Sequence, residues 1–488
     1  MKRVALKSHA AAVFDSFEGN GDNGFAPVSR TLNCKRFGAS FAVTLEIFNN
    51  RSFCECSIAM NNIHFPSQPR DLIEYFESKS TANVEYQLSY GMPGESALKR
   101  TAELMRNATQ QRMDEELSSE SRANLLQYGP PQGDPRYLRA LAKFLETEYG
   151  DSVDSTDLVA TAGASSGLVY FLVSLFPQRC TVFCEELTYM IAADFLQNMH
   201  FNVVPVKMDA NDGINIEDLA EHLAALPETD TTSDGWRSVV YLIPTFHNPT
   251  GINTSPEKCT KIVQLARKHR VVVFCDDVYN LLSYTDSGPP KRLFAYDKKS
   301  DCDYKGNVIS NGSFSKYLSP GLRLGWMELP AWFRSKYWND SSLIQSGGCL
   351  NAYTAGVVAR ALDDGCVQQC LQSSTHEYKM RMQTALNVLA NRLPKQCTYE
   401  IPTGGFFIWI NLPKAVSANG VLQHCLRKYN TGFMLGPRFT PDRVAAETRF
   451  GHCLRISISY LPTEKLEIAV NNVCSAVDDV LSGKPTIS

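Results

Sequence analysis

Residues 310–326 read SNGSFSKYLSPGLRLGW. Within this stretch the hydroxyl groups of Ser313 and Ser315 precede the amine of Lys316, and Arg323 follows seven residues later. A lysine amine that burial or a neighbouring cation keeps deprotonated can form a Schiff base with an aldehyde. A guanidinium group can bind phosphate oxygens through two parallel hydrogen bonds. The stretch therefore indicates a reactive amine beside a phosphate-binding group, although an S-x-S-K pattern alone is also common in surface loops.

Two further polar motifs follow buried strands. The motif DDVY begins at Asp276 and ends at Tyr279, directly after the predicted strand Val271–Cys275, and NPTG begins at Asn248, after the predicted strand Val239–Ile243. Open α/β sheets bind ligands at the carboxyl ends of their strands. There Asp276 could pair with a protonated pyridine nitrogen, and Tyr279 could reach a phenolate oxygen. Taken singly, both motifs are also typical of solvated turns.

A loop of small residues, AGASSG at residues 162–167, lies between the predicted strand Leu158–Thr161 and the predicted helix Leu168–Phe176. Small side chains let backbone N–H groups approach an anion at a helix N-terminus. The loop is a candidate phosphate cradle, but turns from strand to helix favour such residues in any case.

Short apolar runs alternate with amphipathic stretches from about residue 84 onward, which predicts strand–helix–strand units around a mostly parallel sheet. The predicted strands are Leu158–Thr161, Thr181–Cys184, Val203–Val206, Val239–Ile243, Val271–Cys275, Val308–Ser310 and Leu324–Met327. The predicted helices are Leu168–Phe176, Ser255–Arg270 and Thr375–Leu393. Strand-like segments at Gly404–Ile410 and Leu454–Ile458 predict a second, smaller α+β domain.

The composition is that of a globular protein of two or three domains, with 488 residues, 44% of them hydrophobic. The 48 basic residues balance 51 acidic ones, which argues against a nucleic-acid or anionic-membrane binder. No apolar run approaches the ~20 residues that a membrane helix needs. The 15 cysteines include no C-x-x-C pair, so we expect thiols in a reducing compartment and no metal site.

The N-terminal residues 1–17 read MKRVALKSHAAAVFDSF and contain no acid before Asp15. This composition fits a mitochondrial presequence loosely, and it fits a disordered or arm-like tail better, since chain termini are often disordered. We expect a cytoplasmic protein and keep a mitochondrial location as the alternative.

The ordered set of motifs, GASSG, NPTG, DDVY, SFSK and RLG, resembles the fold-type-I pyridoxal-phosphate enzymes, and among them the class I/II aminotransferases. The spacings also fit that pattern, with 28 residues from Asn248 to Asp276 and 40 from Asp276 to Lys316. The segments LQYGPPQG at 126–133 and PTGGFFIWI at 402–410 resemble the kynurenine/2-aminoadipate aminotransferase branch.

The resemblance covers about residues 84–475 and implies an α/β fold like that of aspartate aminotransferase. A large domain with helices on both sides of a mostly parallel sheet would bind the cofactor. We expect residues 84–134 to form the N-terminal part of the small domain with a dimer contact, 135–355 the large domain and 356–488 the C-terminal small domain. Residues 1–83, for which the family has no fixed equivalent, are left as an unassigned N-terminal arm or tail.

The resemblance also implies roles around the ring of the cofactor, pyridoxal 5′-phosphate. Lys316 would bind it covalently and then move a proton between the substrate Cα and the cofactor. Asp276 would keep the ring nitrogen protonated, which makes the ring an electron sink. Asn248 and Tyr279 would bind the ring oxygen, and Tyr189 would stack on the ring.

The phosphate group would be bound by the backbone of Ala164 and Ser165 and by the side chains of Ser313, Ser315 and Arg323. The family often has a polar side chain at the position of Ala164. The methyl group there leaves that part of the binding to the backbone.

Two roles concern the substrate and the partner. Arg455 would bind the substrate α-carboxylate, with Asn248 beside it. Tyr128 would reach the phosphate of the neighbouring subunit, which implies a homodimer.

The activity implied by the resemblance is amino transfer between an amino acid, aromatic or 2-aminoadipate-like, and a 2-oxo acid such as 2-oxoglutarate. Two alternatives remain open at this point. One is a lyase reaction on the same cofactor, because the angle that selects the broken Cα bond is not visible in a sequence. The other is a non-catalytic module that senses the cofactor.

Overall fold

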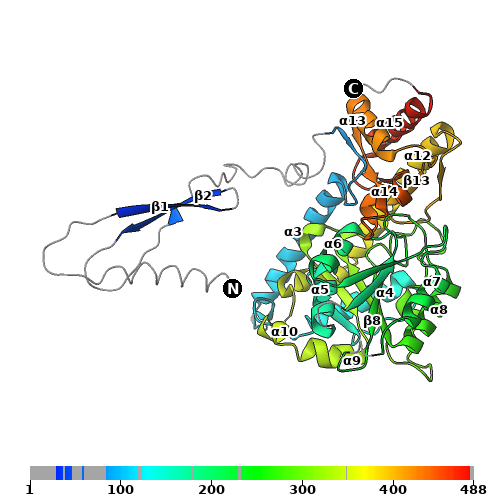
Figure 1. Ribbon diagram of the computed structural model, residues 1–488. Helices are drawn as coiled ribbons and strands as arrows, with labels where there is room; N and C mark the ends of the chain where they lie inside the picture. Colours follow the sequence, from blue (N-terminus) through cyan, green and yellow to red (C-terminus); the bar gives the residue numbers. More distant parts are fainter. Residues whose placement is uncertain are drawn as a thin grey trace, which may run out of the picture. The chain divides into compact units, whose positions relative to one another are not determined.

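The computed structural model describes residues 84–483, apart from 119, 121, 177–179, 229–231 and 348, and the backbone of three strands nearer the N-terminus. Those strands, β1 (Ser29–Arg36), β2 (Ala39–Glu46) and β3 (Ile58–Ala59), form an antiparallel sheet within a first compact unit, Met1–Ala82. Residues Asn83–Ser488 form a second unit (Figure 1). The predicted presequence or tail, residues 1–17, lies outside the described residues.

The second unit contains a seven-stranded sheet with the order β5-β11-β10-β9-β8-β6-β7. Its strands are β5 (Leu158–Thr161), β6 (Thr181–Glu185), β7 (Asn202–Val206), β8 (Ser238–Leu242), β9 (Val271–Asp276), β10 (Val308–Ser313) and β11 (Gly325–Glu328). Only β11 runs antiparallel, against both β10 and β5. The other neighbouring pairs are parallel, which confirms the predicted mostly parallel sheet.

Apolar side chains along the central strands point alternately to the two faces of the sheet, which explains why helices cover both faces. In β9 the side chains of Val272 and Phe274 pack with those of helix α5 (Ala164–Leu175), whereas Val273 and Cys275 pack with helices α7 (Ile216–Ala224) and α8 (Pro256–His269). Successive side chains of a strand point to opposite faces of the sheet. Because helices cover both faces, every residue of β9 is buried.

A smaller part of the second unit is formed mainly by C-terminal residues (Figure 1). Its four-stranded sheet has the order β12-β13-β16-β15, with β12 (Thr398–Tyr399), β13 (Phe407–Asn411), β15 (Met434–Leu435) and β16 (Cys453–Ser457). Helices α12 (Cys366–Arg392), α13 (Ala418–Tyr429) and α15 (Thr463–Leu481) pack together next to it. A short parallel pair joins β4 (Tyr86–Gln87) to β14 (Thr431–Gly432).

The remaining helices connect these parts. The α-helices are α3 (Glu95–Glu116), α4 (Pro135–Tyr149), α6 (Met190–Asn198), α9 (Ala331–Phe333), α10 (Ser342–Gly347), α11 (Ala352–Asp363) and α14 (Ala446–Phe450). The short 3₁₀ and π segments are η1 (Asn124–Leu126), η2 (Leu293–Tyr296), η3 (Phe314–Lys316), η4 (Pro320–Leu322), η5 (Arg334–Asn339) and η6 (Gly436–Phe439).

All seven predicted strands of the large sheet are confirmed to within three residues, the largest difference being β10, which continues to Ser313. The predicted start of the helix at Thr375 was wrong, because α12 begins nine residues earlier, at Cys366. Its first turns bury Val367 and Leu371 among polar residues, a pattern too sparse to reveal a helix. The start at Leu168 was also wrong, since α5 already begins at Ala164. The domain limits near residues 134 and 355 stay a prediction.

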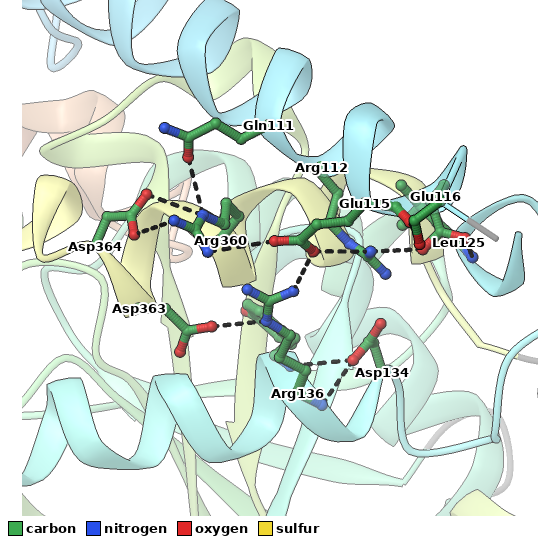
Figure 2. Close-up of polar contacts among 12 residues, drawn as sticks. Gln111, Arg112, Glu115, Glu116, Leu125, Asp134, Arg136, Arg360, Asp363 and Asp364 are labelled. Atoms are coloured by element: carbon green, nitrogen blue, oxygen red, sulfur yellow. Dashed lines mark hydrogen bonds and ion pairs between the residues drawn. The ribbon is translucent and has the colours of Figure 1, made fainter. Parts of the chain in front are cut away.

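An ion-pair network fixes α3 against two other helices (Figure 2). Glu115 on α3 lies 2.6 Å from Arg136 on α4 and 3.2 Å from Arg360 on α11. Arg112, one turn earlier on α3, also lies 3.2 Å from Glu115. The hydrogen bond from Arg136 and the charges of the three guanidinium groups lower the pKa of Glu115. One carboxylate therefore joins three helices.

We expect Glu115→Gln to lower the free energy of unfolding by about 1 kcal/mol, the upper part of the range for partly exposed ion pairs. The folded-state pKa of Glu115 is lowered, so its contribution is present above its unfolded pKa and is lost as the pH falls through its folded pKa. Urea unfolding at neutral pH measures the difference. The control is Glu95→Gln on the same helix, whose pair with Lys99 is 75–80% exposed. Equal effects of the two substitutions would contradict a structural role for the network.

Candidate active site

A cavity of about 210 Å³ lies where the central strands end. Asp276 is the last residue of β9, Ser313 is the last residue of the parallel neighbour β10, and Ile243 follows β8. This is the carboxyl edge of the sheet, where α/β proteins bind ligands. Ten of the predicted site residues line the cavity, namely Ala164, Ser165, Tyr189, Asn248, Asp276, Tyr279, Ser313, Ser315, Lys316 and Arg323.

The amine of Lys316 lies inside this cavity at the end of η3, and not on a surface loop. Its Nζ donates a hydrogen bond to the carbonyl oxygen of Gly91 at 3.1 Å and lies 5.4 Å from the ring centroid of Tyr279. Burial lowers the pKa of Lys316 to about 8, against the opposing effect of the nearby Asp276 carboxylate. A lowered pKa makes the nucleophilic, uncharged amine accessible near neutral pH.

The carboxylate of Asp276 is buried with one of its oxygens unsatisfied. Oδ2 accepts a hydrogen bond of 2.7 Å from the hydroxyl of Tyr241, whereas Oδ1 has no hydrogen-bond partner. Burial raises the pKa of Asp276 to about 6, while Tyr241 and Lys316 act in the opposite direction. An unsatisfied buried acceptor costs free energy unless a donor is supplied. A protonated ring nitrogen would be such a donor.

The N-terminus of α5 and the loop after β10 form a cradle for an anion. Gly163, the N-cap of α5, has φ 89°, and a Cβ there would lie 2.9 Å from the guanidinium of Arg323. Ser313 Oγ donates to Ser315 Oγ at 2.8 Å, and both hydroxyls line the cavity. Free N–H groups at a helix start, two hydroxyls and a guanidinium match the requirements of a phosphate.

The two tyrosines and the asparagine of the site are on other walls of the cavity. Tyr189, the N-cap residue of α6, has its pKa raised to about 12, first by burial and then by the charge of Asp276. Burial also raises the pKa of Tyr279, so both phenols stay protonated donors at neutral pH. Asn248 is 3% exposed and accepts a hydrogen bond of 2.8 Å from Arg455.

Arg455 is a buried cation on β16, only 2% exposed. Besides Asn248 it contacts the carbonyl oxygen of Ser89, to which Nη2 donates at 2.6 Å. Its guanidinium carbon lies 4.1 Å from the ring centroid of Phe407 and 4.8 Å from that of Phe439. Within the described part of the chain no carboxylate forms an ion pair with it, and its Nε has no hydrogen-bond partner. Burial lowers its pKa to about 10.

Two predicted site residues do not line this cavity: Arg455 lies beside it, bonded to Asn248, whereas Tyr128 lies away from it. Its side chain is 76% exposed and lines a different hollow, beside Arg136 and Cys349. An exposed position of this kind is compatible with a contact to a second subunit.

Several groups near the site were not found from the sequence. Tyr241, Phe407 and Phe439 are ordinary apolar positions in their segments, and Ser89 and Gly91 act through backbone carbonyl oxygens, which carry no sequence signal. Only Tyr241 carried a sequence signal. Its hydroxyl is a polar atom in an otherwise apolar strand, two residues before the predicted end of that strand.

The fold and the cavity define a class of enzyme. A mostly parallel sheet presents a lysine with a lowered pKa, a buried carboxylate that lacks a donor and an anion cradle around one cavity. Pyridoxal phosphate carries an aldehyde, a ring nitrogen and a phosphate, so its chemistry fits these three features.

The chain belongs to the class I and II aminotransferases, because the model of the family described as "Aminotransferase class I and II" matches residues 89–473. Its cofactor is pyridoxal phosphate, and it is a transaminase that acts on amino acids and 2-oxo acids. This assignment favours amino transfer over a lyase reaction and over a non-catalytic sensor.

Relatives and solved structures agree with this family. Aromatic-amino-acid aminotransferase 1 of Thermococcus litoralis is 24% identical over 357 residues, which are 73% of this chain and 81% of that protein. The 2-aminoadipate transaminase of Thermus thermophilus is 28% identical over 363 residues, 73% and 83% of the two chains. The kynurenine aminotransferase of Pyrococcus horikoshii shares the fold, with a TM-score of 0.70 at 23% identity over 87% of this chain and 98% of that one.

None of the helices in the described residues combines the length and apolar character needed to cross a membrane.

Proposed function

We propose that Lys316 binds the cofactor covalently and that its neighbours orient the ring. Asp276 would hold the ring nitrogen in its protonated state through the unsatisfied Oδ1. Asn248 and Tyr279 would donate to the ring oxygen, and Tyr189 would stack on the ring face. Support comes from their common position around one cavity.

The phosphate would lie at the N-terminus of α5. Backbone N–H groups of Ala164 and Ser165, the hydroxyls of Ser313 and Ser315 and the guanidinium of Arg323 would bind its oxygens. Arg323 already has a left-handed backbone conformation, with φ 47°, which is costly for a non-glycine residue. Strained conformations of this kind are concentrated at functional sites, which supports a role for the Arg323 side chain in binding the phosphate.

Arg455 would bind the α-carboxylate of both substrates. The observation that carries this proposal is a buried guanidinium without a counter-ion, beside the cavity and next to Asn248. A buried charge is stable only when it is paired, and a carboxylate bound through two charge-assisted hydrogen bonds would supply the pair. The substrate would displace the carbonyl oxygen of Ser89 from Nη2.

The reaction requires a proton to leave and later to return. When bound, the cofactor supplies an electron sink for the electrons of the broken Cα–H bond. Lys316, once released by the substrate amine, would accept the Cα proton and return it to the adjacent carbon of the cofactor. Its lowered pKa of about 8 suits an acid and base that must act in both directions near neutral pH. One arginine would serve the amino acid and the 2-oxo acid in turn.

We infer donors with aromatic or 2-aminoadipate-like side chains and a 2-oxo acid such as 2-oxoglutarate as the acceptor. The support is the naming of relatives as an aromatic-amino-acid aminotransferase and a 2-aminoadipate transaminase. We also propose a homodimer in which Tyr128 reaches the partner's phosphate site, with its 76% exposure in the single chain as support. A cytoplasmic location is proposed, with the mitochondrion as the alternative.

The test is a panel of amino acids with 2-oxoglutarate as the common acceptor, followed by measurement of glutamate. We expect aromatic amino acids and 2-aminoadipate to give kcat/KM at least about tenfold above alanine, because a bulky or charged side chain adds binding energy of this order. Equal rates across the panel, or glutamate formed only from small amino acids, would contradict the proposed donor class.

A further inference from the structure

We propose that Tyr241 is a positioning residue for the cofactor, which acts by holding Asp276 in the orientation and charge state that the ring nitrogen requires. The inference rests on the proposed role of Asp276. Nothing in the sequence motifs points to Tyr241, which is an internal residue of strand β8.

The register of the sheet explains why this contact forms. Tyr241 on β8 is paired with Phe274 on the parallel strand β9, and their rings are stacked with 14° between the planes. Residues two apart on a strand point to the same face, so Phe274 and Asp276 share the face of Tyr241. The tyrosine side chain is long enough to extend past Phe274 and place its hydroxyl 2.7 Å from Asp276 Oδ2.

The hydroxyl of Tyr241 can act only as a donor to this carboxylate. Tyr241 is 0% exposed, and burial together with the charge of Asp276 raises its pKa well above the ordinary value, so it stays protonated. A donor of this kind favours the ionised form of a carboxyl group. It also occupies Oδ2, which leaves Oδ1 as the oxygen available for the ring nitrogen.

Burial of Tyr241 and Asp276 disfavours the ionised form of the Asp276 carboxyl group. Burial is the largest influence on the pKa of Asp276 and raises it, whereas the hydrogen bond from Tyr241 and then the charge of Lys316 on η3 act in the opposite direction; the resulting pKa is about 6. The other ionisable groups near Tyr241 and Asp276 are Tyr189, Tyr279, Arg455, Arg323, Glu185 on β6 and Asp277, the residue after β9. The carboxyl of Asp277 instead accepts from Ser310, so Tyr241 is the hydrogen-bond donor specific to Asp276.

The experiment compares binding of two cofactors to the apoprotein, pyridoxal phosphate and its 1-deaza analogue, in which C–H replaces the ring nitrogen. The ratio of their Kd values measures the contact between Asp276 and the nitrogen. We expect the wild type to bind pyridoxal phosphate at least about tenfold more tightly, the value of a hydrogen bond to a charged group. In Tyr241→Phe this ratio should fall severalfold, and the pH dependence of the visible cofactor band should shift to higher pH.

The control is Tyr170→Phe, which removes the hydroxyl of another buried tyrosine, one that donates to the backbone oxygen of Tyr337 at 2.8 Å. This control should leave the ratio unchanged. In an Asp276→Asn background, Tyr241→Phe should produce no further fall in the ratio, and this comparison remains valid if the single variant is less stable.

A Tyr241→Phe variant that weakens both cofactors equally, or that leaves the ratio at the wild-type value, would overturn the proposal. A wild type that binds both cofactors equally well would overturn the proposed role of Asp276, and a wild type that binds neither would overturn the cofactor site itself.

Discussion

Lys316→Ala is expected to abolish covalent binding of the cofactor and to lower kcat by at least about 10⁴-fold. The loss is large because the same amine would form the covalent linkage and transfer the Cα proton, and general acid–base catalysis alone contributes up to about 10⁴-fold. The measurement is the visible absorption band of the purified variant after addition of pyridoxal phosphate, together with glutamate formation at saturating substrate.

The matched control is Lys336→Ala, which removes an exposed lysine that pairs with Asp234 on the surface. The control should keep both the band and the activity. Small primary amines added to Lys316→Ala should restore part of the activity, because they can take over the proton transfer. A variant without Lys316 that retains the band and the wild-type rate would rule out the proposed role of this residue.

Arg455→Gln is expected to lower kcat/KM for the amino acid and for the 2-oxo acid by about 10²–10³-fold each. Loss of one guanidinium removes two charge-assisted hydrogen bonds to the α-carboxylate, each stronger than a neutral hydrogen bond. Both substrates carry that carboxylate, so both half-reactions should suffer to a similar extent. Steady-state kinetics with each substrate varied in turn measures the two effects.

The specificity of this effect is checked with an amine that lacks the carboxylate. Conversion of such an amine, slow in the wild type, should change little in Arg455→Gln. Arg443→Gln is the control, since Arg443 is a partly exposed arginine that pairs with Asp194. A fall confined to one of the two substrates, or an equal fall for the amine, would contradict the assigned role.

The strands of the large sheet could be predicted because their composition leaves few alternatives. Short runs such as VVVFC in β9 are apolar on both faces, and they recur between amphipathic segments. Helix α12 could not be placed at its N-terminal end, because burial of Val367 and Leu371 depends on packing against other helices. The limits of an element are decided by tertiary contacts wherever the local periodicity is weak.

The candidate site likewise contains residues that could be predicted from the sequence and residues that could not. Side chains in ordered motifs, such as Lys316 and Asp276, could be found because chemistry requires those residue types at the ends of strands. The partners of those side chains could not be found. Tyr241 reaches Asp276 from another strand, and Ser89 and Gly91 contribute only carbonyl oxygens to Arg455 and Lys316.

The most direct test of the account is to locate the bound cofactor on the chain. The protein is loaded with pyridoxal phosphate, reduced with borohydride and digested with trypsin, which does not cleave after a modified lysine. We expect the added phosphopyridoxyl mass on Lys316, within an uncleaved peptide of residues 306–323. The same mass on another lysine, or no adduct at all, would contradict it.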